Sequence, residues 1–370
     1  MIRERGPLTV AAFMDLALYD SEHGYYARAA QRSGRAGDFF TSVDVGSLFG
    51  ELLEVQLAEI FQVSEGGFQI FDLVEAGAGN GRLAADILRA AKRRDPAFYE
   101  AVRLHLVEAS AEARRAQAAT LGEVADRLAS SGPALPDSFA GVLVANELLD
   151  AMPVHQVVMR EDGLREVYVT ANAERRTSND QPLMIVEGPP STPALAEYLT
   201  RLGVALDPGW CVEINLRAVD WIRDAARRLR RGFIILIDYG HEARELYSPT
   251  HSTGTLTTFA KHRSGGPEGA AGAPPWLQQP GEQDLTAHVD FTSVRAAAEA
   301  EGLTTIGFLD QTYFLLGLVE ALDMSDMRTR LALKTLVVPG GMGSTHKVLI
   351  LGKGVGTPAL RGLSFRVRVT

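Results

Sequence analysis

The fold of this 370-residue chain is decided by one stretch, Phe71-Asp72-Leu73-Val74-Glu75-Ala76-Gly77-Ala78-Gly79-Asn80-Gly81-Arg82-Leu83. An apolar run of strand length ends in an acidic residue, three glycines then alternate with other residues, and a segment of helical composition follows. Glycines suit such a loop because the backbone must turn sharply and approach a ligand without intervening Cβ atoms. The first N–H groups of the following helix are free to bind a carboxylate or phosphate. The stretch therefore predicts a strand–loop–helix ligand site.

Strand-like and helix-like segments alternate along the rest of the chain. Helices are predicted at residues 82–91, 109–121 and 216–231. Further strands are predicted at residues 103–107, 141–145, 233–237, 303–308, 347–351 and 364–369. Such alternation is typical of a parallel sheet with helices on both faces, so we predict a Rossmann-like, doubly wound α/β fold.

The domain organisation follows from where this alternation begins and is interrupted. Residues 1–62 have helical spacing of apolar residues and are predicted to form an N-terminal helical extension and cofactor lid. Residues 63–355 form the predicted core, with insertions near 155–210 and 241–285 on the substrate side. Residues 356–370 are expected to be a C-terminal strand or tail.

Composition excludes several classes of function. The formal net charge is −9, which argues against a non-specific nucleic-acid binder that would need a basic face. The sequence contains one cysteine, Cys211, and no apolar stretch long enough to span a bilayer, and it begins without the apolar core of a secretory signal. A cytoplasmic protein without membrane association is therefore expected. The eight histidines show no metal-ligand spacing, so no metal is expected.

The glycine spacing distinguishes between cofactors. A dinucleotide loop has the form G-x-G-x-x-G, whereas Gly77, Gly79 and Gly81 follow Glu75 in the form E-x-G-x-G-x-G. This form resembles motif I of class I methyltransferases, in which the acid faces the methionine end of S-adenosylmethionine (SAM). SAM carries an ammonium group and no pyrophosphate, so a carboxylate here suits SAM. We predict that these residues, together with Ala78, bind SAM; a dehydrogenase remains an alternative, without a hydride-transfer constellation to support it.

Acidic and amide residues follow two other predicted strands. Glu108 follows the strand 103–107, where its carboxylate can accept hydrogen bonds from both ribose hydroxyls; the alternative is a solvated strand end. Asn146 and Glu147 follow the strand 141–145 and so lie at the carboxyl edge of the sheet, where open α/β folds bind ligands. These two, with Asp150, are candidate catalytic residues, although Asx residues also cap turns.

An ordered set of motifs resembles the MidA-like family of SAM-dependent methyltransferases. The matching segments are His23-Gly24-Tyr25-Tyr26 and residues 37–42, 49–52, 75–81, 145–154, 237–240, 284–291 and 347–349. This resemblance implies a class I methyltransferase fold and SAM as cofactor. Mitochondrial members of that family act as complex I assembly factors and are described as protein arginine methyltransferases. The chain departs from the family at Leu148-Leu149, where an aromatic pair is usual, and at His346, where a phenylalanine is usual.

The resemblance adds candidate residues and a function. It implies that Asp38 and Thr41 contact SAM, although Thr41 could also be a helix N-cap. His288 is a candidate proton acceptor or a structural histidine. If the methyl acceptor is a guanidinium, Glu147 and Asp150 are the candidates to hold its planar fork. We therefore expect a SAM-dependent methyltransferase that acts on arginine in an acceptor protein. A small-molecule O- or N-methyltransferase and a SAM-binding assembly chaperone without turnover remain alternatives.

Overall fold

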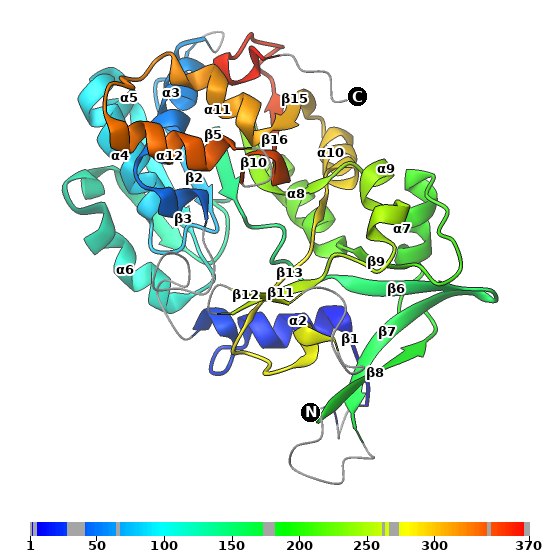
Figure 1. Cartoon of the computed structure of the whole chain (residues 1–370). Coiled ribbons are helices and arrows are strands. Elements are labelled where there is room, and N and C mark those ends of the chain that lie inside the picture. Colours follow the sequence, from blue (N-terminus) through cyan, green and yellow to red (C-terminus); the bar gives the residue numbers. More distant parts are fainter. Residues whose placement is uncertain are drawn as a thin grey trace.

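The computed structural model describes residues 2, 6–27, 41–63, 67–172, 182–260, 263–265, 274–338 and 342–365. Within these residues a large mixed sheet forms the centre of the molecule, and two smaller sheets lie beside it (Figure 1). The strands of the large sheet are β2 (Phe71–Ala76), β3 (Val102–Val107), β4 (Leu128–Gly132), β5 (Phe139–Asn146), β10 (Leu229–His241), β14 (Val289–Asp290), β15 (Thr304–Asp310) and β16 (His346–Lys353).

The strand order of the large sheet creates a place for a ligand. The order is β15-β16-β10-β5-β2-β3-β4, and β14 pairs with β10. Strands β4, β3, β2, β5 and β10 are parallel to one another, whereas β16 is antiparallel to both β10 and β15. From β2 the chain proceeds outward to β3 and β4, and then returns to β5 on the other side of β2. Ligands of open α/β sheets bind at such a reversal, beyond the carboxyl ends of the strands.

Both faces of the large sheet are buried, as a doubly wound fold requires. In β5 the side chains of Val142 and Val144 belong to one hydrophobic cluster, and those of Leu143 and Ala145 belong to the other. Successive residues of a strand point to opposite faces, so this alternation places a separate core on each side. The predicted Rossmann-like, doubly wound α/β architecture is confirmed.

Helices cover the two faces in separate groups. On the first face are α3 (Leu48–Val63), α4 (Arg82–Arg94), α5 (Pro96–Ala101), α6 (Ala111–Leu121), α11 (Gln311–Val319) and α12 (Met327–Val337). On the second face are α7 (Ala194–Leu202), α8 (Leu216–Arg228), α9 (Ala243–Leu246) and α10 (Phe291–Ala300). The short helix α13 (Met342–Thr345) precedes β16. In the described residues no helix is both long and apolar enough to cross a membrane.

The two smaller sheets pack around the N-terminal helix α2 (Val10–Tyr19) (Figure 1). One contains β1 (Leu8–Thr9), β6 (His155–Arg160), β7 (Gly163–Ala171), β8 (Leu183–Gly188) and β9 (Cys211–Ile214). The other contains β11 (Thr257–Ala260), β12 (Arg263–Gly265) and β13 (Asp284–Thr286). Phe13 and Trp276 join the helix to this assembly, with ring centroids 5.9 Å apart. The segment 1–62 thus contributes α2 to the smaller sheets and α3 to the main core.

Two boundaries differ from the sequence prediction. The helix predicted at 216–231 ends at Arg228, because β10 already begins at Leu229 and pairs with Phe139 of β5. The strand predicted at 364–369 is not present at Ser364 and Phe365, and its other residues lie outside the described chain.

Candidate functional site

The glycine loop is held at the carboxyl end of β2 by its neighbour β3. The backbone N–H groups of Gly77 and Ala78 both donate to the carbonyl oxygen of Val107, at 2.9 and 3.0 Å. Gly77, Gly79 and Gly81 have φ angles of +73°, +50° and +84°, a region that L side chains rarely adopt. A Cβ at Gly77 would lie 3.1 Å from the Leu148 side chain. The loop therefore needs glycine for its conformation and, at Gly77, for space.

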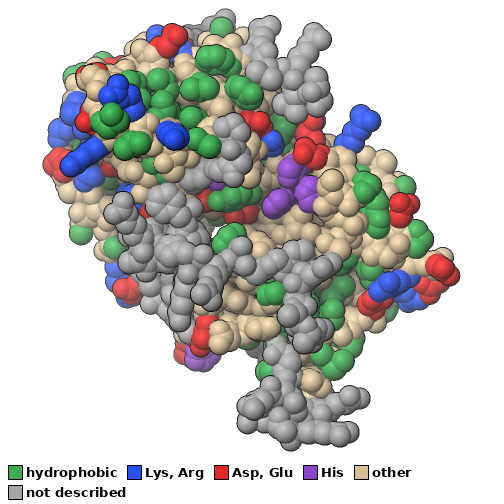
Figure 2. Space-filling view, in the orientation of Figure 1, with side chains coloured by type: hydrophobic (Ala, Val, Ile, Leu, Met, Phe, Trp, Pro, Cys, Tyr) green, Lys and Arg blue, Asp and Glu red, His purple; other side chains and the backbone are tan. Residues whose placement is uncertain are grey.

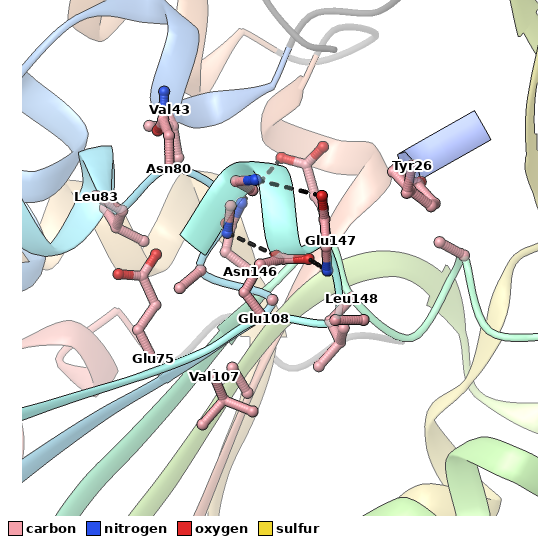
Figure 3. A pocket seen from close by; sticks show the side chains of 18 of the residues that line it. Tyr26, Val43, Glu75, Asn80, Leu83, Val107, Glu108, Asn146, Glu147 and Leu148 are labelled. Atoms are coloured by element: carbon pink, nitrogen blue, oxygen red, sulfur yellow. Dashed lines mark hydrogen bonds between the residues drawn. The ribbon is translucent and has the colours of Figure 1, made fainter. Parts of the chain in front are cut away.

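A cavity of about 320 Å³ opens beyond this loop, within the range common for small-molecule sites (Figure 3). It lies at the strand reversal between β2 and β5. Its lining residues are Tyr19, Tyr26, Thr41, Val43, Glu75, Ala76, Gly77, Ala78, Gly79, Asn80, Arg82, Leu83, Val107, Glu108, Ala109, Ser110, Ala113, Pro133, Asn146, Glu147, Leu148, Ala151 and Trp221.

Glu108 connects the end of β3 to the glycine loop. Its Oε2 accepts a hydrogen bond from the Gly79 N–H at 2.8 Å, and its Oε1 accepts one from the Ser110 N–H at 2.7 Å. A carboxylate has about four acceptor positions, so both oxygens retain capacity for two ligand hydroxyls. In Figure 3 the side chain lies beside the cavity, between Glu75 and Glu147 in that view. The geometry can hold a ribose diol and fix the loop at the same time.

Glu75 is a buried carboxyl group at the bottom of the loop. Its Oε2 accepts a hydrogen bond of 3.0 Å from the Ala84 N–H in the first turn of α4. Burial raises the pKa of Glu75 to about 8, the Glu108 and Asp86 carboxylates add to the rise, and the Ala84 N–H opposes it. Without a cation, Glu75 is therefore mostly protonated at pH 7. A ligand ammonium nearby would favour its ionised form.

We expect this raised pKa to make the ligand-free protein less stable as the pH rises. The folded protein keeps a proton that the unfolded chain releases above a pKa of 4.5, so the unfolding free energy decreases between pH 4.5 and about 8. Glu75→Gln keeps an acceptor for Ala84 and should remove up to about 1.4 kcal/mol per pH unit from that slope. Urea unfolding at pH 6 and pH 8 measures the slope, with Glu112→Gln on α6 as control. Equal slopes for wild type and Glu75→Gln would contradict the prediction.

Asn146 and Glu147 lie side by side at the end of β5. Glu147 has a φ of +50°, an uncommon value for a non-glycine residue and one that costs about 1–3 kcal/mol. Its Oε1 accepts hydrogen bonds from the Ser42 N–H at 3.2 Å and the Asn146 Nδ2 at 3.1 Å, and lies 3.5 Å from His346 Nε2. The Oδ1 of Asn146 is buried without a hydrogen-bond partner among the described residues. The strained backbone thus presents a carboxylate and a vacant amide acceptor at the cavity.

Two further carboxyl groups lie behind Glu147. Asp238, three residues before the end of β10, accepts hydrogen bonds from the N–H groups of Leu148 and Leu149 at 3.1 and 2.7 Å and so fixes the turn after β5. Burial raises its pKa to about 7. Asp150 is also buried, its pKa is raised well above the ordinary value by burial and by Asp238 and Glu147, and its Oδ1 has no hydrogen-bond partner in the described chain.

Most of the predicted site residues line the cavity, but some do not. Eight of the predicted residues line the cavity, namely Thr41, Glu75, Gly77, Ala78, Gly79, Glu108, Asn146 and Glu147. Gly81 does not line it but precedes α4 as its N-cap, and Asp150 lies behind the lining. His288 does not line the cavity either and instead faces His241 and His251. Asp38 lies outside the described residues.

Sequence reasoning missed several aromatic and charged residues of the site. Tyr19 and Tyr26 line the cavity, and their rings are 5.5 Å apart. The Tyr26 hydroxyl donates to Asp284 at 2.8 Å, which connects the cavity to β13. Arg82 pairs with Asp44 at 2.9 Å, and Asp44 also accepts from Thr41, so this pair holds Thr41 at the glycine loop. Tyr26 belongs to a motif of the family resemblance, but residue type alone does not distinguish either tyrosine from a core residue.

The segment that contains this site matches a known protein family. Residues 52–309, more than half of the chain, match the family described as "Putative S-adenosyl-L-methionine-dependent methyltransferase". The chain belongs to this family. It is a SAM-dependent methyltransferase, as the glycine spacing and the MidA-like resemblance predicted.

Curated relatives and solved structures agree with this assignment. Protein arginine methyltransferase NDUFAF7 of Mus musculus is 29% identical over 95% of this chain and 78% of its own length. Its homologue in Drosophila melanogaster is 29% identical over 96% and 83%. A Burkholderia thailandensis protein crystallised with S-adenosyl-homocysteine is 29% identical, with a TM-score of 0.86, over 100% of this chain and 93% of that one. SAM is therefore the cofactor of this methyltransferase.

One expectation was wrong. A cytoplasmic location was expected, chiefly because Cys211 is the single cysteine of the sequence. The relatives from mouse, fly and rat are named as mitochondrial proteins, which overturns that expectation. Cysteine content indicates a reducing environment, and it does not distinguish between reducing compartments.

Proposed function

We propose that this methyltransferase transfers the methyl group of SAM to an arginine side chain of an acceptor protein. The observation that carries the proposal is a group of buried carboxyl groups at one end of the cofactor cavity. Glu147 lines the cavity, and Asp150 and Asp238 lie behind it. Among the described residues, no lysine or arginine forms an ion pair with any of these three, and burial raises the pKa of Asp150 and Asp238, so a bound cation would favour their ionised forms. The site thus suits a cationic acceptor.

A guanidinium matches this site better than other acceptor groups. It stays charged at all physiological pH values, is planar, and offers paired N–H donors to a carboxylate. Glu147 can accept one pair, and the vacant Oδ1 of Asn146 can accept a further N–H. The relatives from mouse and fly, which are named protein arginine methyltransferases, support the same substrate.

The cofactor has a corresponding place on the other side of the cavity. We propose that Glu108 binds the ribose hydroxyls and that Glu75 faces the ammonium group. Bound SAM supplies an electrophilic methyl group on a sulfonium. Its transfer to the acceptor nitrogen would leave S-adenosylhomocysteine, and the proton that this nitrogen loses would pass to solvent. Glu147 would orient that nitrogen, so positioning and desolvation account for most of the rate.

The experiment is a transfer assay with methyl-labelled SAM and the proteins of a cell lysate. We expect label in protein, recovered after acid hydrolysis as methylarginine and absent when Glu147 is replaced by Gln. Label recovered only in small molecules would contradict the proposal and favour a metabolite methyltransferase. Binding of SAM without any label transfer would instead favour an assembly chaperone.

A further inference from the structure

Three histidines that are far apart in the sequence meet beside the carboxyl edge of the main sheet. His241 is the last residue of β10, His251 ends a short 3₁₀ helix (Pro249–His251), and His288 lies between β13 and β14. In the described chain each offers one ring nitrogen to a group whose members all lie within 4.8 Å of one another. Figure 2 shows histidine side chains gathered in a patch on the visible face, next to acidic side chains.

Each of the three imidazoles has a ring nitrogen that makes no hydrogen bond among the described residues and could bind a metal. The Nδ1 of His251 lies 3.1 Å from the carbonyl oxygen of Glu245, and such a bond fixes the tautomer and leaves Nε2 with a free lone pair. The Nδ1 atoms of His241 and His288 are buried and have no hydrogen-bond partner among the described residues. The Glu245 carboxylate lies 3.1 Å from His241 Nδ1. A buried polar atom without a partner requires an explanation, and an ion is one.

The protonation state of these imidazoles suits coordination. Burial, together with the neighbouring His241 and His251, lowers the pKa of His288 to about 4, and burial also lowers the pKa of His241. Imidazoles that are neutral at pH 7 are the form that coordinates a metal.

We propose that His241, His251 and His288 form a binding site for one divalent first-row transition metal, for which Zn²⁺ is the probe. Imidazole ligands select this class of ion over Mg²⁺ and Ca²⁺, which require oxygen ligands. Three nitrogens at about 2.0–2.1 Å from Zn²⁺ are about 3.3–3.6 Å apart. Rotations of the imidazole rings that move these nitrogens by about 1 Å would therefore bring all three to the metal. The fourth position is open to water or to the Glu245 carboxylate.

The proposed role is structural, because the three histidines come from three separate segments. β10 belongs to the main sheet, the 3₁₀ helix follows α9, and His288 follows β13 of a smaller sheet. The Ala287 N–H donates to the Asp150 carbonyl oxygen at 2.9 Å, so the segment before His288 also bounds the buried acidic group. A metal here would fasten the β11–β13 sheet to the end of β10. The sequence spacing of the histidines gave no sign of this site, because only the fold brings them together.

The test is calorimetric titration of the full chain with Zn²⁺ after dialysis against a chelator. We expect one equivalent of Zn²⁺ to bind. At saturation it should raise the midpoint of thermal unfolding by roughly several degrees, because it binds the folded state and not the unfolded chain. His251→Ala should weaken binding by about tenfold or more. Co²⁺ should give the visible absorption of a tetrahedral site in wild type and lose it in a His241→Ala/His288→Ala variant.

The matched control is His23→Ala, because His23 is an exposed histidine far from the cluster in the sequence, with 80% of its side-chain surface accessible. It should bind Zn²⁺ as wild type does. Circular dichroism of each variant separates loss of the site from loss of the fold. Failure of the folded wild type to bind Zn²⁺, or equal binding by wild type and folded His251→Ala, would overturn the proposal.

Discussion

Glu108→Gln is expected to weaken the binding of S-adenosylhomocysteine by about 100-fold. Both oxygens of this carboxylate already accept backbone N–H groups, from Gly79 and Ser110. A glutamine side chain has one acceptor oxygen, so its NH₂ group would oppose one of these donors and leave it unsatisfied. Hydrogen bonds to a charged group contribute about 1.5–3 kcal/mol each, and losing one of them corresponds to about 10- to 150-fold in affinity. Calorimetric titration with S-adenosylhomocysteine measures the change.

Glu112→Gln is the matched control for this experiment. Glu112 lies in the first turn of α6 and pairs with Arg115 on the same helix, and its side chain is 47% exposed. Exposed pairs of this kind contribute little, so both affinity and stability should stay close to wild type. An affinity for Glu108→Gln within threefold of wild type would show that the ribose is held elsewhere.

The part of the site that sequence could predict is the part formed by neighbours in the chain. The apolar run of β2, the three glycines and the start of α4 are contiguous, and each residue type has a local reason for its position. Glu108 and Asn146 were also predictable, since the end of a parallel strand is always at the same edge of the sheet. The fold class followed from the alternation of strand-like and helix-like segments along the chain.

The rest of the site depends on contacts between distant segments. Nothing near Asp238 in the sequence indicates that its carboxylate accepts the N–H groups of Leu148 and Leu149. His346 was noted only as a departure from the family pattern, yet its Nε2 lies 3.5 Å from Glu147 Oε1 and its ring centroid lies 3.9 Å from that of Tyr239. His288 was assigned from its motif, and its position beside His241 depends on the pairing of β14 with β10. Spacing rules cannot detect side chains that meet through sheet pairing.

Glu147→Gln is expected to reduce the rate of methyl transfer by at least about 100-fold while the affinity for S-adenosylhomocysteine changes by less than about threefold. Glutamine keeps the length of the side chain and an oxygen that can accept the Ser42 N–H, so the turn after β5 should be preserved. What it loses is the charge that would bind and orient a guanidinium. Loss of one group that stabilises the transition state typically lowers the rate by about 10²–10³. Label transfer from SAM into protein measures the rate, and calorimetry measures the affinity.

The two measurements together distinguish a catalytic carboxylate from a structural one. If Glu147 served only to hold the strained turn, its replacement would lower the thermal midpoint and the cofactor affinity together, since Leu148 also packs against Gly77 of the cofactor loop. Lost transfer with an unchanged midpoint and unchanged affinity therefore requires a role towards the acceptor. Glu147→Asp, which keeps the charge but shortens its reach, should restore part of the rate if the carboxylate acts directly. Wild-type transfer by Glu147→Gln would mean that the acceptor is not held by this group, and the proposal of an arginine substrate would lose its structural support.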